Sequence, residues 1–210
     1  MRVLITAGPS SEPIDEVRVI TNRSTGELGV VLAEHLSRAG HAVEVFLGQG
    51  ATYRWKGAQA FANNQELDQL LARTARQETV DVVFHAAALT DFRVERIGMS
   101  ETKDVVKIAS DGGPISLQLV PQPKLIGSLR KYFPRARIVG WKYEHGITRT
   151  ALLLEAAHQM QQNHTDACVV NGRAFGPGFG VWTDDGLIAT CDSKPSLAEF
   201  FVRWMSKASE

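Results

Sequence analysis

The chain has 210 residues, enough for one domain, with 44% hydrophobic and 22% charged residues, as in an ordinary soluble globular protein. It carries 23 basic and 23 acidic residues, so its formal net charge is +0. No long-range field therefore favours nucleic acid or an anionic membrane, and neither is expected as a partner.

The cysteines and the N-terminal segment indicate a cytoplasmic protein. Cys168 and Cys191 lie in no CxxC pair and cannot form a disulfide framework. Residues 1–10 contain one basic residue and a very short apolar run, too short for a signal peptide, and no later run reaches membrane-spanning length. We expect residues 1–210 to form a single domain in a reducing compartment.

Apolar patterning predicts strands that alternate with helices. In chain order the expected elements are a strand at 3–6, a helix at about 28–39, a strand at 43–47, a helix at 65–76, a strand at 81–85, a helix at 123–132, a strand at 137–141, a helix at 148–162, a strand at 167–171, a hairpin around 183–186 and a helix at 197–205. Two long polar stretches, 9–25 and 90–118, interrupt this rhythm and are expected to be irregular and functional.

The alternation favours an α/β fold with three Rossmann-like layers: a mostly parallel sheet, helices on both faces, and a flap at about 92–118. Ligands of such sheets bind beyond the carboxyl ends of the strands. Gly8 follows the first strand, but the G-x-G-x-x-G pattern of a dinucleotide site is missing. A plain NAD-dependent reductase is therefore disfavoured.

A second motif, residues 21–29, leads into the first helix. Ser24, Thr25 and Gly26 are small residues at a helix N-terminus, which suits a phosphate or a carboxylate. Arg23 adds a positive charge, and Asn22 offers an amide that can polarise a carbonyl. Helix capping explains Ser24 or Thr25 alone, but not the whole motif.

A third motif, residues 86–93, follows the strand at 81–85. Three successive alanines would let a flat ring lie close to the backbone, while Asp91 could accept hydrogen bonds or lie near Mg²⁺. Tight helix–strand packing with Asp91 as a cap is the simpler alternative. None of the six histidines forms a zinc-binding pattern, so no protein-bound metal is predicted.

Together these segments resemble the phosphopantothenoylcysteine synthetase (phosphopantothenate–cysteine ligase) family. The similarity runs in the family's order through GPSSEPIDEVRVITNRSTGELG, VDVVFHAAALTDFRV, VVKIAS, IVGWKYE and ACVVNG, and covers most of the chain. Members of that family activate the phosphopantothenate carboxylate with a nucleotide, CTP or ATP, in the presence of Mg²⁺. Cysteine then displaces the nucleotide monophosphate.

The resemblance implies a role for each matching residue. Asn22 and Lys107 would be catalytic, Asn22 at the acyl group and Lys107 on a flap over the reacting phosphate. Substrate-binding residues would be Arg23, Ser24, Thr25, Gly26 and Asn171. Nucleotide-binding residues would be Gly8, Ala87, Ala88, Asp91, Val120, Gln122, Pro123 and Trp141.

The chain departs from the family pattern on the triphosphate side. Ala109 and Ser110 replace lysines of a K-x-K-K motif, Gln159 and Asn163 occupy expected lysine positions, and Gly172 replaces the aspartate of an N-D pair. Each lost phosphate contact would remove roughly 1–3 kcal/mol of binding free energy. Two alternatives therefore stay open: a ligase with a rearranged nucleotide grip, or a non-catalytic or repurposed member that binds a phosphopantothenate-like ligand or a partner subunit.

The expected partners are small molecules: 4'-phosphopantothenate, cysteine and CTP or ATP. By analogy with the family, a homodimer is expected, with the flap near the partner subunit.

Overall fold

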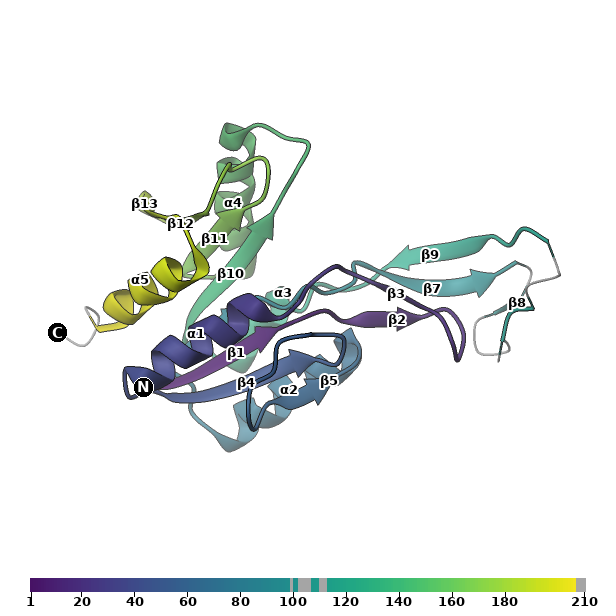
Figure 1. The fold of residues 1–210 in the computed structure, drawn as a ribbon, viewed down its shortest axis with the longest axis horizontal. Helices are drawn as coiled ribbons and strands as arrows, with labels where there is room; N and C mark the ends of the chain where they lie inside the picture. Colours follow the sequence, from purple (N-terminus) through teal and green to yellow (C-terminus); the bar gives the residue numbers. More distant parts are fainter. Residues whose placement is uncertain (99, 102–106, 110–112, 207–210) are drawn as a thin grey trace.

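In the computed structural model of the chain, the central sheet has eight strands in the order β13-β12-β11-β10-β6-β1-β4-β5 (Figure 1). The six strands from β11 to β5 run parallel, while β12 and β13 are antiparallel at one edge. If the six parallel strands are numbered 1 to 6 in chain order, their order across the sheet is 3-2-1-4-5-6, as in Rossmann folds. The direction in which successive strands are added reverses between β1 and β6, which is the topological switch point. The structure describes residues 1–98, 100–101, 107–109 and 113–206.

The helices are α1 (Glu27–Arg38), α2 (Asn64–Gln77), α3 (Ile126–Tyr132), α4 (Arg149–Asn163) and α5 (Lys194–Ser206). The strands of the central sheet are β1 (Arg2–Ala7), β4 (Ala42–Gly48), β5 (Gln59–Phe61), β6 (Val82–His85), β10 (Arg137–Tyr143), β11 (Ala167–Asn171), β12 (Phe179–Thr183) and β13 (Gly186–Cys191). The remaining strands are β2 (Ser11–Pro13), β3 (Val19–Thr21), β7 (Phe92–Ile97), β8 (Ser100–Glu101) and β9 (Leu117–Pro121).

Helices cover both faces of the sheet because side chains alternate along each strand. Ile5 of β1 packs with Leu36 of α1 and Phe201 of α5 on one face. The preceding residue, Leu4, packs with Leu71 of α2 and with α3 on the other face. Apolar residues of α4 also pack on the sheet, against β11. The expected three-layer α/β Rossmann-like fold is confirmed.

The expected elements of the main sheet are also confirmed, with small shifts at their ends. Asn63 caps α2, since its Oδ1 accepts a hydrogen bond from the Glu66 N–H at 2.9 Å. The final helix starts at Lys194 rather than Leu197, because Ser193 accepts the Ser196 N–H at 3.2 Å and so begins the helix ahead of its first apolar residue. The short strand β5 was not predicted.

The two stretches expected to be irregular were interpreted wrongly in part, since both contain strands. Residues 11–21 form the β2–β3 hairpin, and residues 92–121 contain β7, β8 and β9. The Val94 N–H of β7 donates to Glu12 Oε1 of β2 at 3.3 Å, so the two parts are joined. Figure 1 shows these strands extending away from the main sheet; we call the described residues within 11–21 and 92–121 the arm.

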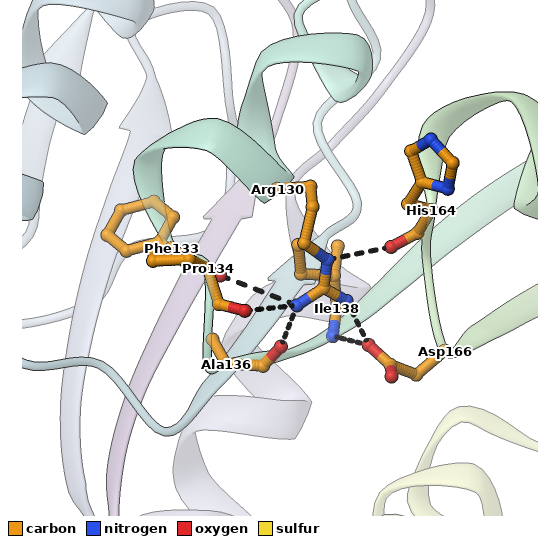
Figure 2. Close-up of polar contacts among 7 residues, drawn as sticks. All are labelled: Arg130, Phe133, Pro134, Ala136, Ile138, His164 and Asp166. Atoms are coloured by element: carbon orange, nitrogen blue, oxygen red, sulfur yellow. Dashed lines mark hydrogen bonds and ion pairs between the residues drawn. The ribbon is translucent and has the colours of Figure 1, made fainter.

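Arg130, near the end of α3, joins three chain segments through polar contacts (Figure 2). Its guanidinium donates to the His164 carbonyl at 2.9 Å, to the Ala136 carbonyl at 2.7 Å and to Asp166 Oδ2 at 2.7 Å. The same Asp166 oxygen accepts the Ile138 N–H at 2.7 Å. This network fixes the N-terminal ends of β10 and β11, the two strands that carry site residues toward their C-terminal ends.

Within the described ranges, every helix is too short or too polar to cross a lipid bilayer.

Candidate active site

Two adjoining cavities open at the carboxyl ends of the parallel strands. The larger has a volume of about 930 Å³ and the smaller about 160 Å³. They share six lining residues, Ala87, Leu89, Asp91, Lys124, Trp141 and Gln159, and so form one continuous site. Its position at the β1–β6 switch point is where Rossmann-type sheets bind ligands.

The floor of the site is formed by the loops after β1 and β6, which stay hydrogen-bonded beyond the strands. The Ala88 N–H donates to the Gly8 carbonyl at 2.9 Å, and the Ser10 N–H donates back to the Ala88 carbonyl at 3.2 Å. Gly8 has φ 77°, a conformation that favours glycine. The half-buried alanines 86–88 therefore present a flat shelf without bulky side chains.

The N-terminus of α1 faces the larger cavity, because Glu27, Leu28 and Gly29 all line it. Gly26 ends the preceding loop at φ 77°, and a Cβ there would come within 2.9 Å of the Ala51 Cβ. The Thr25 hydroxyl accepts the Glu27 N–H at 3.3 Å. The first turn thus directs its backbone N–H groups and the positive end of its dipole toward the cavity.

Asn22 joins the two loops that border the cavity. Its Nδ2 donates to the Leu89 carbonyl oxygen at 2.7 Å, across 67 residues of sequence. The amide is thereby held where the arm meets the main sheet, beside the alanine shelf.

Positive charge predominates around the larger cavity, which is lined by four cationic side chains, Arg23, Lys124, Lys142 and Lys194, and two carboxylates, Glu27 and Asp91, together with His145. Lys194 forms an ion pair with Glu27, and its hydrogen bond lowers the pKa of that carboxyl. Lys142 Nζ lies 3.2 Å from Glu144 and 3.5 Å from Glu155. The site suits an anionic ligand.

Trp141 of β10 and Asn171, the last residue of β11, line the larger cavity. Trp141 Nε1 and Asn171 Oδ1 are both buried and have no hydrogen-bond partner within the described part of the chain. Buried polar groups ordinarily have a partner, so two unpaired ones in a cavity wall are consistent with a ligand-binding surface.

Most residues predicted for the site come together in it. Those that line the larger cavity are Gly8, Asn22, Arg23, Ser24, Thr25, Gly26, Ala87, Ala88, Asp91, Trp141 and Asn171, and those that line the smaller include Gln122 and Pro123. Two predicted residues are outside both linings: Val120 pairs with Arg93 within the arm, and Lys107 lies on the arm as an exposed residue.

Gln122 lines the smaller cavity and also forms hydrogen bonds that connect parts of the fold. Its Nε2 donates to the Phe92 carbonyl at 3.0 Å, to Thr90 Oγ1 at 3.2 Å and to Glu12 Oε2 at 3.4 Å. These bonds fasten the base of the arm to the rim of the site. Glu12 is partly buried there, and burial raises the pKa of its carboxyl.

Sequence reasoning did not assign Lys124, Lys194, Asn64 or His85 to the site. Lys124 directly follows the predicted segment 120–123, so the segment could have been extended by one residue. Lys194 comes from the start of α5, and no local pattern links it to the first helix. Asn64 and His85 line the smaller cavity from α2 and β6.

The positions that depart from the family pattern have distinct environments. Gln159 lines both cavities, whereas Asn163 donates from Nδ2 to the Gln159 carbonyl of its own helix at 2.7 Å. Gly172 has φ 98°, and a Cβ there would lie 2.5 Å from the Glu144 carbonyl oxygen. Ala109 is exposed on the arm, and Ser110 lies outside the described residues.

Within the described residues, no three His, Cys, Asp or Glu side chains gather at metal-binding distance. Asp91 lines both cavities, however, and Mg²⁺ is commonly held by one or two carboxylates together with the phosphates of a nucleotide. The residues present fit a magnesium ion that arrives with its nucleotide.

Comparisons with known proteins identify the family of this chain. Residues 1–203 match the family model of the DNA/pantothenate metabolism flavoprotein C-terminal domain. The chain is 34% identical to the coenzyme A biosynthesis bifunctional protein CoaBC of Thermococcus kodakarensis over 183 residues, covering 83% of this chain and 42% of that protein. It is 28% identical to CoaBC of Mycobacterium tuberculosis over 205 residues, covering 94% of this chain and 48% of that protein.

Solved structures show the same fold. The DNA/pantothenate metabolism flavoprotein from Streptococcus pneumoniae has a TM-score of 0.85 at 24% identity and covers 99% of both chains. A Cab2 H337A mutant, solved in complex with phosphopantothenate-cysteine, has a TM-score of 0.74 at 17% identity over 100% of this chain and 89% of that one. The chain spans less than half the length of the CoaBC relatives. On the match over residues 1–203, the chain belongs to the family of the DNA/pantothenate metabolism flavoprotein C-terminal domain.

Proposed function

We propose that this chain is a nucleotide-dependent ligase that joins the carboxylate of phosphopantothenate to the amino group of cysteine, with CTP or ATP as co-substrate and Mg²⁺. The observation that carries this proposal is the gathering of Asn22, the alanine shelf and Asp91 in one cationic cavity. Support comes also from the family match and from the related Cab2 mutant, which was solved with phosphopantothenate-cysteine.

The proposed reaction has two steps. A carboxylate oxygen attacks the α-phosphorus of the nucleotide and pyrophosphate leaves, which gives an acyl-nucleotide. The cysteine nitrogen then attacks the acyl carbon, the nucleoside monophosphate leaves, and the nitrogen loses a proton. A carboxylate is a poor electrophile until one of its oxygens becomes part of a good leaving group, so the nucleotide is needed for the second step.

The protein's part in this reaction is positioning and electrostatics. The N-terminus of α1 and Arg23 offer N–H donors and charge for an anionic group, and Lys124 and Lys142 add further positive charge. Asn22 would polarise the acyl carbonyl. Mg²⁺, held by the phosphates and Asp91, would neutralise part of the triphosphate charge.

The smaller cavity is proposed to hold the nucleotide base. Pro123 and Trp141 provide apolar surface, and the shelf residue Ala87 is shared with the larger cavity, where the triphosphate would extend. A flat heterocycle can lie against Ala87 because no longer side chain projects there.

A direct assay tests the activity. The purified chain is mixed with phosphopantothenate, cysteine, Mg²⁺ and either CTP or ATP, and pyrophosphate and the coupled product are measured. Release of pyrophosphate that requires phosphopantothenate supports the ligase and identifies the nucleotide. If no nucleotide gives pyrophosphate while phosphopantothenate still binds, the ligase proposal is wrong.

Asn22→Ala separates the two steps. Acyl-nucleotide formation should persist, while its reaction with cysteine should slow by roughly 100-fold, the usual effect of removing one donor to a developing oxyanion. Rapid-quench detection of accumulated acyl-nucleotide measures this. Arg38→Gln, on the exposed end of α1, is the control. Equal slowing of both steps would assign Asn22 a role in binding alone.

We also propose that the chain acts as a homodimer in which Lys107 serves the cavity of the second copy. Lys107 is not in the cavity lining of its own chain, and the arm that carries it exposes several apolar side chains, Val17, Val19, Phe92 and Leu119. Exposed apolar side chains of this kind are typical of a contact between subunits.

Complementation tests the shared site. Lys107→Gln and Asn22→Ala should each be nearly inactive, but a co-expressed mixture should recover about a quarter of wild-type turnover, since half of the dimers contain one intact site of two. Sedimentation measures the dimer itself. If mixed dimers recover no activity, then Lys107 acts in the cavity of its own chain or takes no part in the reaction.

A second candidate function is ligand binding without turnover. It is favoured by Gln159 and Gly172, which stand where the family carries a lysine and an aspartate. Phosphopantothenate binding measured by calorimetry, in a protein that releases no pyrophosphate, would support it.

A further inference from the structure

The turn between β2 and β3 contains an acidic residue that the proposed reaction does not use. The Asp15 side chain is fully buried. Its Oδ1 accepts the N–H groups of Val17 at 2.9 Å and Arg18 at 2.7 Å, and its Oδ2 accepts Arg18 Nη1 at 2.6 Å. Asp15 thus organises its own turn and orients the Arg18 guanidinium.

The same pair reaches a residue about 90 positions later. Asp15 Oδ2 accepts the Ile108 N–H at 3.0 Å, and Arg18 Nη1 donates to the Ile108 carbonyl at 3.3 Å. Ile108 lies outside any strand, so these side chains bind its N–H and C=O as a neighbouring strand would. Ile108 is the residue directly after Lys107.

The electrostatics agree with a fixed contact. The Ile108 N–H is the largest cause that lowers the pKa of Asp15 to about 2, with the Val17 and Arg18 N–H groups and the Arg18 charge acting in the same direction. The carboxylate is therefore ionised at neutral pH, and it offers Ile108 a charged acceptor, which is stronger than a neutral one.

We propose that Asp15 and Arg18 are positioning residues that clamp the main chain at Ile108 and so hold Lys107 in place for the reacting phosphate. This role rests on the proposed ligase function. A lysine has a long flexible side chain, and its charge is useful only if the backbone beneath it is fixed. The clamp supplies that constraint where no strand ladder does.

Hydrogen exchange tests the clamp independently of activity. In the wild-type chain the Ile108 amide should exchange slowly, and Asp15→Asn should accelerate its exchange at least 10-fold, because the charged acceptor is lost. Glu34→Gln, which removes the acceptor of an exposed Arg38 pair on α1, is the control and should leave Ile108 unchanged. Equal Ile108 exchange in Asp15→Asn and wild type overturns the clamp.

Kinetics test whether the clamp acts through Lys107. Asp15→Asn and Arg18→Lys should each lower kcat by about 10- to 100-fold, with little change in the KM for phosphopantothenate, since misplacement of a catalytic group costs this much. Arg18→Lys retains the positive charge but loses the planar guanidinium group with its several N–H donors. Because the Arg18 side chain is 42% exposed, this variant should fold even if Asp15→Asn does not.

A double-mutant cycle gives the decisive outcome. In the Lys107→Gln background, Asp15→Asn should lower kcat by less than about twofold more, because a positioning residue has nothing left to position. Fully multiplicative losses overturn action through Lys107. If the wild-type chain releases no pyrophosphate, the ligase proposal fails, whereas the clamp is still supported or overturned by the exchange of the Ile108 amide.

Discussion

Gln159 donates a hydrogen bond from Nε2 to the Trp141 carbonyl oxygen at 3.3 Å and thereby ties α4 to β10 where the two cavities meet. A neutral amide thus occupies a position that lines both cavities and that the family resemblance assigns to a phosphate-binding lysine. A hydrogen bond within the fold therefore stands where the resemblance predicts a positive charge.

Gln159→Lys should therefore strengthen nucleotide binding. An ammonium group at this position would form a charge-assisted hydrogen bond with a phosphate, and we expect roughly 10-fold tighter binding of CTP or ATP by calorimetry. Asn163→Lys is the matched control: it lies one turn further along α4, outside both cavity linings, and should have a smaller effect. Equal effects at both positions, or none at position 159, would contradict this assignment.

Lys142, the residue after Trp141 on β10, carries a positive charge. It lies between Glu144 and Glu155 and lines the larger cavity. Lys142→Gln would leave the two carboxylates uncompensated beside the cavity, so nucleotide affinity should fall at least 10-fold.

Two further variants check the prediction for Lys142. Adding Glu155→Gln to Lys142→Gln should restore part of the affinity, because one repulsive charge is removed. Lys131→Gln, on the exposed side of α3, should bind nucleotide like the wild type. If Lys142→Gln binds nucleotide as tightly as the wild type, the phosphates are bound by Lys124 and Arg23 and not by Lys142.

The main sheet could be predicted from sequence because its strands are buried on both faces and read as apolar runs, such as residues 81–85 and 167–171. The arm could not. Its strands β2 and β3 have three residues each, too few to show a period of two, and its turn residues are polar. Their pairing depends on contacts between distant segments, such as Val94 with Glu12.

The site was predictable where its residues follow strands, as with Gly8, the alanine shelf and Asn171. It was less predictable where a residue arrives from a distant segment. Lys194 reaches Glu27 across 167 positions, and Gln122 matches a nucleotide-binding loop but also fastens the arm. Position alone does not reveal such contacts, because they depend on how the elements pack.

Asp166 tests how the hydrogen bonds at the N-terminal ends of β10 and β11 contribute to the stability of the fold. One of its oxygens accepts hydrogen bonds from both Arg130 and the Ile138 backbone (Figure 2). Asp166→Ala should lower the free energy of unfolding by about 1–2 kcal/mol in urea titrations, less than for a buried pair because the Asp166 side chain is 40% exposed. Asp184→Ala, in the turn between β12 and β13, should change it by less than about 0.5 kcal/mol. Similar losses in the two variants would remove any special role for the Arg130 network.

His85 should make stability depend on pH. It is buried beneath the smaller cavity, with Nδ1 2.8 Å from the Thr6 hydroxyl, and burial lowers its pKa from 6.5 to about 4. The folded chain therefore resists protonation that the unfolded chain accepts. Stability from this residue is complete above about pH 6.5, is lost as the pH falls toward 4, and changes little below that.

The wild-type chain should consequently lose roughly 2–3 kcal/mol more unfolding free energy than His85→Gln between about pH 7 and about pH 4.5. Urea titrations of both proteins at several pH values measure the difference, and the comparison cancels the carboxyl groups that titrate in both. Parallel pH profiles would mean that His85 takes up its proton equally well in the folded chain, and that the strand end beneath the smaller cavity is open to water.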